Sequence, residues 1–189
     1  HSTYKKSRRG NDLIDRAVEK VLIDSGKPYE MLDFSADGSD ERQFCSPGFN
    51  LPMGSLMRTP YARYPEYHTS ADNLDLVKPE FLADSFHKYN EVVYVLESNA
   101  TYLNLNPKCE PQLGKRGIYQ TLGGQHEDLG QSAQQEDLRQ LALLWVLNLS
   151  DGTNSLLDIA NRSGLSFKQI KSAADALLEH NLLKEIATT

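Results

Sequence analysis

The stretch Pro65-Glu66-Tyr67-His68-Thr69-Ser70-Ala71-Asp72-Asn73 decides how this chain is interpreted, because it lies in a long irregular segment between predicted helices and strands. Residues 35–77 are rich in glycine and proline, and a long ordered loop of this kind is uncommon unless it carries function. A carboxylate beside an imidazole, as Asp72 follows His68, can fix the ring tautomer of a metal ligand. From the residues alone, a single His-x-x-x-Asp is more often a hydrogen-bonded turn.

The residues before this loop predict a helix followed by a strand, which is half of an α/β unit. The helix is expected from Asn11, as its cap, to Ile23, with Gly26 as the left-handed residue after its end. A strand is expected from Tyr29 to Phe34, and Met53 to Met57 could form another. The apolar residues of the helix recur at helical spacing at Ile14, Ala17, Val18, Val21 and Leu22.

After the loop, Pro79 suits the first position of a helix that is expected to run to about Glu97. Its apolar residues lie on one face, and this pattern predicts that they are buried. They are Phe81, Leu82, Phe86, Tyr89, Val93 and Leu96.

The C-terminal part of the chain predicts a winged helix. A connector, residues 101–135, contains one short strand at Tyr102–Leu105 and a flexible stretch at 125–135. Residues 136–189 predict three helices and a final strand at 182–186, with a break at 150–152. The first part of the chain, 1–100, is then the α/β domain. The expected inward residues of the three helices are Leu138, Leu141, Trp145 and Leu149, then Leu156, Leu157, Ile159 and Ala160 before Gly164, then Phe167, Ile170, Ala174, Leu177 and Leu178 after the cap Ser166.

Composition disfavours a nucleic-acid binder, because the net charge is −6 and phosphate affinity depends on clustered lysine and arginine. The basic run of residues 5–9 is a local exception. We expect no membrane span and no signal peptide, and we expect Cys45 and Cys109 to be reduced thiols in the cytoplasm. The chain begins without methionine, so we expect a fragment or a processed product.

Four of the five histidines are expected to have no functional role, namely His1, His87, His126 and His180. His68 is the exception, since it lies among tyrosines and prolines in the irregular segment.

Three segments together resemble the end of the M28-type zinc aminopeptidase-like family, and most closely a bacterial branch with a C-terminal winged helix. They are Gly38-Ser39-Asp40-Glu41-Arg42-Gln43-Phe44, Leu51-Pro52-Met53-Gly54 and Tyr67-His68-Thr69-Ser70-Ala71-Asp72-Asn73-Leu74. In that family a Ser-Asp-His-x-x-Phe segment precedes a strand, and a later His-Thr-x-x-Asp segment supplies the last zinc ligand. The resemblance covers nearly the whole chain. It implies the C-terminal part of a three-layer αβα domain followed by a small winged helix.

The resemblance also implies roles for single residues. His68 matches the final zinc ligand, and Asp72 matches the acidic position that supports it structurally. Tyr67 matches a tyrosine that hydrogen-bonds the tetrahedral intermediate in some relatives. Asp40 matches the aspartate of the Ser-Asp-His segment, but Glu41 replaces its histidine, which leaves the role of this segment open.

The family's other zinc ligands and its general base have no match in this chain, and all would precede His1. A catalytic zinc needs about three protein ligands and an open position for water. We therefore expect no hydrolysis of peptide or amino-acyl substrates by this chain alone, and we expect dimerisation, strand exchange or an upstream catalytic portion as partner. Two other hypotheses remain open: a non-catalytic protein-interaction module built on the winged helix, and a transcription factor.

Overall fold

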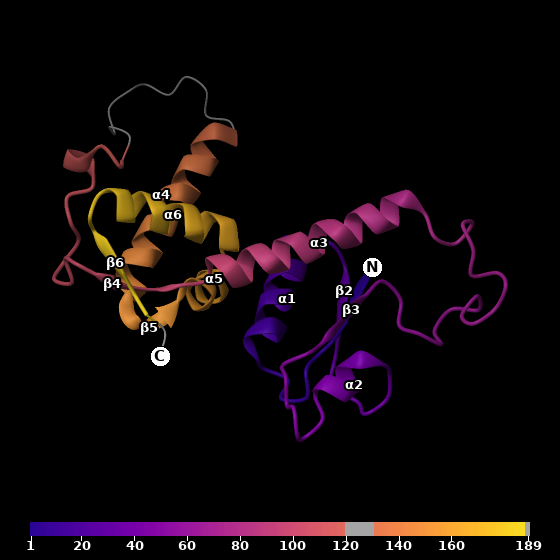
Figure 1. The fold of residues 1–189 in the computed structure, drawn as a ribbon. Helices are drawn as coiled ribbons and strands as arrows, with labels where there is room; N and C mark the ends of the chain where they lie inside the picture. The colour runs from indigo at the N-terminus through magenta and orange to yellow at the C-terminus, as the bar shows by residue number, and fades with distance from the viewer. Residues whose placement is uncertain (120–130, 188–189) are drawn as a thin grey trace. The chain divides into compact units, whose positions relative to one another are not determined.

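The computed structural model describes residues 1–119 and 131–187, and the chain divides into two compact units, His1–Glu97 and Ser98–Thr189 (Figure 1). The first is a mixed α/β unit and the second a winged helix, so the expected fold class is confirmed. Among the described residues, no helix has the length and apolar character needed to cross a membrane.

The α/β unit is built around a three-stranded sheet in the order β2-β1-β3. β1 (Ser2–Lys5) runs parallel to β2 (Tyr29–Leu32) and antiparallel to β3 (Ser55–Met57). The three helices of this unit are α1 (Leu13–Asp24), the short α2 (Asp40–Phe44) and α3 (Pro79–Ser98). The parallel pair is connected through α1, as the helix-then-strand pattern predicts.

β1 was missed by the sequence patterns, which treat residues 5–9 as a basic terminal run. All four residues of β1 are buried, and Lys5 is only 3% exposed. The rest of the run is neutralised locally: Lys6 pairs with Asp33 at 3.3 Å and Arg9 with Asp12 at 2.7 Å. The lysine is buried because its ammonium group has fixed partners, which a sequence pattern of polar residues cannot show.

α1 is fixed to the sheet through a buried carboxylate. The Asp15 carboxylate accepts hydrogen bonds from Tyr4 Oη at 2.9 Å and from the backbone N–H of Ser7 at 2.7 Å. Burial, followed by the charge of Asp15, raises the pKa of Tyr4, so the phenol stays protonated as a donor. The N-cap is Asp12 rather than Asn11, whereas Gly26 is left-handed at φ 63°, as predicted.

α3 begins at Pro79 as predicted, but the predicted burial of its apolar face is wrong. Side chains of that face are largely exposed, with Leu82 at 59% and Phe86 at 71%. The helix instead buries the neighbouring face, including Lys88, Val92 and Val95. The exposed apolar face of α3 thus reverses the usual amphipathic arrangement, in which the apolar side chains of a helix face the core.

The winged-helix unit has an antiparallel sheet in the order β5-β4-β6. Its strands are β4 (Thr101–Asn104), β5 (Asp151–Ser155) and β6 (Leu183–Ile186). Its helices are α4 (Gln131–Leu149), α5 (Leu156–Ser163) and α6 (Phe167–Glu179), with a 3-10 turn at Gly114–Arg116. β4 lies within the predicted connector, yet it is the central strand of this sheet.

Several details of this unit match the predictions. Gly164 ends α5 with a left-handed φ of 73°. Ser166 caps α6, where its hydroxyl and the Gln169 side chain form a capping box. The inward residues of α5 are all buried, and those of α6 are buried apart from the half-buried Leu178.

Two predictions for this unit are wrong. α4 begins at Gln131, so 131–135 are helical rather than flexible, while 125–130, with His126, lie outside the described residues. The predicted break of the helix at 150–152 is confirmed, since α4 ends at Leu149, and the same stretch contains the start of β5. The buried face of α4 consists of Ala142, Leu143, Val146 and Leu147, not of Leu138, Leu141, Trp145 and Leu149.

The turn that follows α2 places the backbone of β3 against Tyr4. Cys45 is buried, and its thiol donates to the carbonyl oxygens of Leu51 at 3.3 Å and Met53 at 3.2 Å. These contacts hold residues 51–53 and so set the path into Gly54. The other cysteine, Cys109, is exposed, and both thiols are free.

We expect Gly54→Ala to destabilise the protein by about 2 kcal/mol, as overpacking of a dense core does. A methyl group at Gly54 would lie 2.0 Å from Tyr4 Oη, whereas one at Gly48 would meet no atom within 4 Å. Urea unfolding of both alanine variants measures the difference. Equal stability of the two variants would contradict the packing of Tyr4 on Gly54.

Candidate functional site at the carboxyl end of the parallel strands

The carboxyl ends of β1 and β2 meet at one edge of the sheet, and a cavity of about 260 Å³ lies there. In α/β sheets, ligands bind in crevices outside the carboxyl ends of parallel strands. The cavity is lined by Lys5 at the end of β1, by Asp33 and Asp37 after β2, and by Tyr61 and Arg63 from the long loop. Both strands and the loop therefore contribute charged or polar groups to one site.

Lys5 is the centre of this edge. Its ammonium group lies 2.6 Å from Glu41 Oε1 and donates to the carbonyl oxygen of Asp37 and to Tyr61 Oη, each at 2.9 Å. Lys5 and Glu41 are 3% and 4% exposed, so this is a buried ion pair. One side chain therefore ties β1 to α2 and to the loop that leads to His68.

The ion pair sets the charge state of both partners. Burial raises the pKa of Glu41, but the hydrogen bond and charge of Lys5 together with backbone hydrogen bonds outweigh burial, so the net shift is downward. Burial likewise lowers the pKa of Lys5, but the hydrogen bonds to Glu41 and Tyr61 outweigh it, so the net shift is upward. Both groups are consequently charged at neutral pH.

The structure assigns different surroundings to Asp40 and Glu41. Asp40 is exposed at the start of α2, whereas Glu41, which the resemblance described above matches to a histidine, is the buried partner of Lys5. Sequence analysis missed Lys5, Glu41 and Tyr61. Thr3 and Tyr4 are residue types that are enriched in strands, but two such residues are too short a signal to identify β1.

His68 lies in the irregular loop on a support of two tyrosine rings. Its imidazole stacks on the Tyr67 ring with centroids 3.9 Å apart, and Tyr67 meets Tyr64 edge to face at 5.5 Å. His68 also has a left-handed φ of 58°, which is uncommon for a residue other than glycine. Such backbone strain clusters at functional sites. The side chain of His68 is exposed.

Asp72 does not contact His68 among the hydrogen bonds of the described residues. Its backbone N–H donates to the Thr69 carbonyl at 3.2 Å, and its side chain is exposed. After burial, the charge of Asp72 is the next cause that raises the pKa of Tyr64. Asp72 thus lies on the same aromatic support as His68 without orienting the imidazole.

A catalytic zinc does not fit the residues of this chain by themselves. Such a zinc needs about three protein ligands. Within 1–119 and 131–187, no group of three histidine, cysteine, aspartate or glutamate side chains is arranged to hold a metal ion. His68 can supply at most one ligand of a site that other residues complete.

A second charged cluster lies at the opposite end of the strands. Asp84 of α3 accepts hydrogen bonds from Lys27 and Arg58, each at 2.7 Å, and from Lys88. Lys27 comes before β2 and Arg58 after β3, so the cluster joins both edge strands to α3. The hydrogen bonds from Lys27 and Lys88 hold the pKa of Asp84 far below its ordinary value. Its role is structural, because each cation is directed at the same carboxylate.

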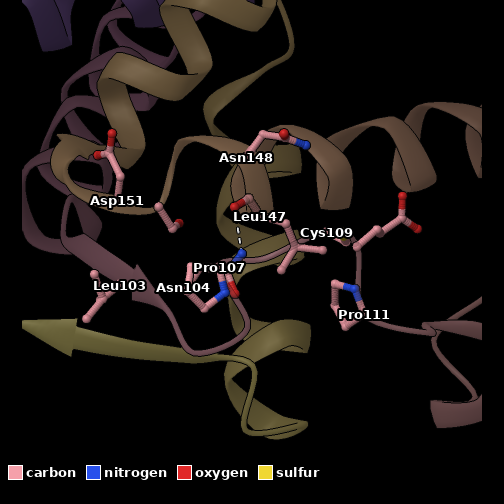
Figure 2. Close-up of a pocket in the computed structure, with 10 residues that line it drawn as sticks. Leu103, Asn104, Pro107, Cys109, Pro111, Leu147, Asn148 and Asp151 are labelled. Atoms are coloured by element: carbon pink, nitrogen blue, oxygen red, sulfur yellow. Dashed lines mark hydrogen bonds between the residues drawn. The ribbon is translucent and has the colours of Figure 1, made fainter.

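The winged-helix unit contains a separate cavity of about 470 Å³, shown in Figure 2. Its centre is Asn104, whose side-chain amide donates to the Leu147 carbonyl at 2.9 Å near the end of α4. The backbone N–H of Asn104 also donates to the Ser150 carbonyl at 2.7 Å. These bonds join β4 to α4, so the polar groups at the centre of the cavity serve the fold.

Each of the two units matches a protein family. Residues 1–99, more than half of the chain, match a family described as "Domain of unknown function (DUF4910)". The chain belongs to this family. Residues 100–185 match a winged helix-turn-helix family, which agrees with the observed helices and sheet.

Two matches from Clostridium acetobutylicum, a curated protein and a solved structure, are similar to this member of the family. One, named as a candidate polysaccharide biosynthesis protein with an aminopeptidase-like domain, is 55% identical over 181 residues, which are 96% of this chain and 40% of that protein. The other is a crystal structure of a candidate peptidase with 51% identity and a TM-score of 0.85, covering 98% of this chain and 39% of that chain. The chain therefore spans about two-fifths of the length of either relative.

These findings confirm the coarse part of the resemblance, since both relatives carry peptidase or aminopeptidase-like names. Nothing in those names specifies zinc. The roles expected for Tyr67, His68, Asp72 and Asp40 remain predictions.

We expect Lys5→Met to destabilise the α/β unit by about 3 kcal/mol, because it leaves the Glu41 carboxylate buried without its cation. The matched control is Lys6→Met, which removes a pair with an exposed aspartate and should cost less than about 1 kcal/mol. Urea unfolding measures both values. Similar losses for the two variants would show that burial of the Lys5 pair contributes little.

The same ion pair predicts a pH dependence. Glu41, with a folded pKa below its ordinary 4.5, stabilises the fold above that pH, and this contribution is lost as pH falls through the folded pKa. Lys5, with a folded pKa above its ordinary 10.5, stabilises the fold below that pH, and this contribution is lost as pH rises through the folded pKa. The stability difference between the wild type and Glu41→Gln should stay constant from about pH 5 to pH 9 and shrink in acid. A difference that grows on acidification would contradict this assignment.

Proposed function

We propose that this chain is the C-terminal portion of a zinc-dependent aminopeptidase-like hydrolase, and that it is inactive without the remaining portion. The observation that supports this most is the 55% identity, over 96% of the chain, to a protein with an aminopeptidase-like domain. The substrate class would be a peptide or an amino-acyl compound. The two free thiols fit work in a reducing compartment such as the cytoplasm.

In this proposal His68 supplies one zinc ligand to a site whose other ligands lie outside this chain. Its left-handed backbone and its stacking on Tyr67 support the role, because both restrict the imidazole to few orientations. Tyr67 would hydrogen-bond the tetrahedral intermediate. Asp72 and Asp40 would serve the shape of the loops rather than the chemistry, in keeping with their exposed side chains.

The buried Lys5–Glu41 pair has a supporting part in this proposal. Through Tyr61 it fixes one end of the loop that carries His68, seven residues before that histidine. A metal ligand on a loop needs such support, because loose positioning costs metal affinity. The pair thereby links the stability of the sheet to the position of the proposed ligand.

The test is the metal content of this chain fused to the remaining portion of the Clostridium relative. We expect about one zinc per protein after dialysis, lost in His68→Ala, because a ligand and not a surface histidine is removed. His87→Ala is the matched control, since His87 is an exposed histidine on α3. Elemental analysis of the dialysed proteins measures the zinc.

Absence of zinc from the folded fusion, or full retention of zinc in His68→Ala, would contradict the proposal. It would leave the alternative, a non-catalytic module that associates with proteins through its winged helix. The observation that favours this alternative is the match of residues 100–185 to a winged-helix family. A DNA-binding function has less support, because on α6 the cation of Lys171 pairs with Asp175 at 2.5 Å and the whole chain is acidic.

A further inference from the structure

The exposed face of α3 carries an ordered apolar stripe. Its members are Leu82, Phe86, Tyr89, Val93 and Leu96, which are separated by four, three, four and three residues. Alternating spacing of this kind places side chains in one line along a helix, as at the seam of packed helices. The exposed fractions of the first four are 59, 71, 51 and 56%. Only Leu96, at the end of the stripe, is half-buried.

Most of this stripe is separate from the surface that α3 uses within its own unit, and the exception is Tyr89, whose hydroxyl donates to the Leu56 carbonyl of β3 at 2.8 Å. The Asp84 cluster holds the helix to the edge strands, and the buried residues of the helix are Lys88, Val92 and Val95. Single exposed apolar residues are ordinary, but a contiguous line of large ones marks an interaction site. The described residues of the unit therefore cover one face of the helix, and they meet the apolar stripe at Tyr89, while Leu82, Phe86 and Val93 stay exposed.

The sheet is also open at its sides. In the part of the chain that the structure describes, β2 and β3 each pair only with β1, so both have an outer edge without a partner strand. Parallel strand pairs such as β1 and β2 occur in sheets that are covered on both faces. An open edge and an uncovered apolar helix in one unit indicate a partner that continues the same layered domain.

The solved relative is long enough to contain such a partner. The crystal structure from Clostridium acetobutylicum contains this fold at a TM-score of 0.85, yet this chain covers 39% of it, which leaves 61% of that chain for other structure. The same fold therefore exists within a polypeptide that has ample further chain to cover the stripe. A second copy of this chain would cover the helix but would bring no additional part of the domain.

We propose that the stripe on α3 is the docking surface for the remaining portion of the aminopeptidase-like domain. The proposal rests on the proposed function only for the identity of the partner, and it does not depend on zinc. The partner presents an apolar surface that accepts Phe86 and Val93, which lie in the middle of the line. Docking occurs whether the two portions belong to one polypeptide or to two.

The experiment is co-expression of this chain with the separately encoded remaining portion of the Clostridium relative, with an affinity tag on this chain only. We expect a one-to-one complex by light scattering after size exclusion. Phe86→Asp combined with Val93→Asp should weaken the complex at least about tenfold, because two charges enter an apolar interface.

His87→Asp is the control for the added charge, since it places one carboxylate next to Phe86 on an exposed site outside the stripe, and it is compared with Phe86→Asp alone as well as with the double variant. It should leave the complex intact. Because the stripe side chains are exposed in this chain, all variants should unfold at the wild-type midpoint when they are alone. This measurement separates loss of docking from loss of folding.

Three results would overturn the proposal. One is a homodimer of the wild type that dissociates in the stripe variants and excludes the remaining portion. Another is two soluble, folded portions that do not associate, and the third is a complex that the stripe variants do not weaken. A stripe-dependent complex that holds no zinc would support the docking surface while contradicting the proposed metal site.

Discussion

The α/β unit depends on the burial of one short polar strand. β1 consists of serine, threonine, tyrosine and lysine, and all four side chains are shielded from water. Such a strand is costly to bury unless its polar groups find partners, and its two largest side chains, Tyr4 and Lys5, have them, whereas the Thr3 hydroxyl has none among the described residues. Asp15 accepts the tyrosine hydroxyl on the side of α1, and Glu41 meets the lysine ammonium on the side of α2. The helices are therefore positioned by charge and hydrogen bonding as much as by apolar contact.

This constraint extends to the candidate site. Because Lys5 ends β1, the pair with Glu41 lies at the edge of the sheet where α/β proteins bind ligands. The bond from Lys5 to Tyr61 brings the constraint to the irregular loop, which carries His68 on its aromatic support seven residues later. A change in the strand can thus reach the loop through a short series of side chains. The winged helix, with its own sheet and caps, is built independently of this series.

The sequence predicted those elements whose signals are local. α1, α5 and α6 have apolar spacing and end signals at Gly26, Gly164 and Ser166, so their existence and most of their inward residues were predictable. β1 was not, because its lysine is buried by partners 36 and 56 residues away, Glu41 and Tyr61. The prediction that the apolar face of α3 is buried in the core was wrong, although the apolar spacing on which it was based is present. Periodicity identifies a face that seeks a partner, but it does not identify where that partner is.

The candidate site likewise has a part that was predictable from the sequence and a part that was not. His68 and its neighbours were identifiable from a motif, because the motif is continuous in sequence. The cavity beside Lys5 was not, because its lining comes from three separated segments that only the sheet brings together. Metal ligation depends on the same long-range assembly, so a single histidine in sequence says little about the geometry around it.

The two cysteines have a practical consequence. The thiol of Cys45 is buried and hydrogen-bonded to two carbonyl groups of the α/β unit, whereas Cys109 is exposed on the winged-helix unit. A maleimide reagent should therefore modify the native chain at one position. The protein carries a natural attachment point for a spectroscopic label on its C-terminal unit, and no cysteine substitution is required to use it.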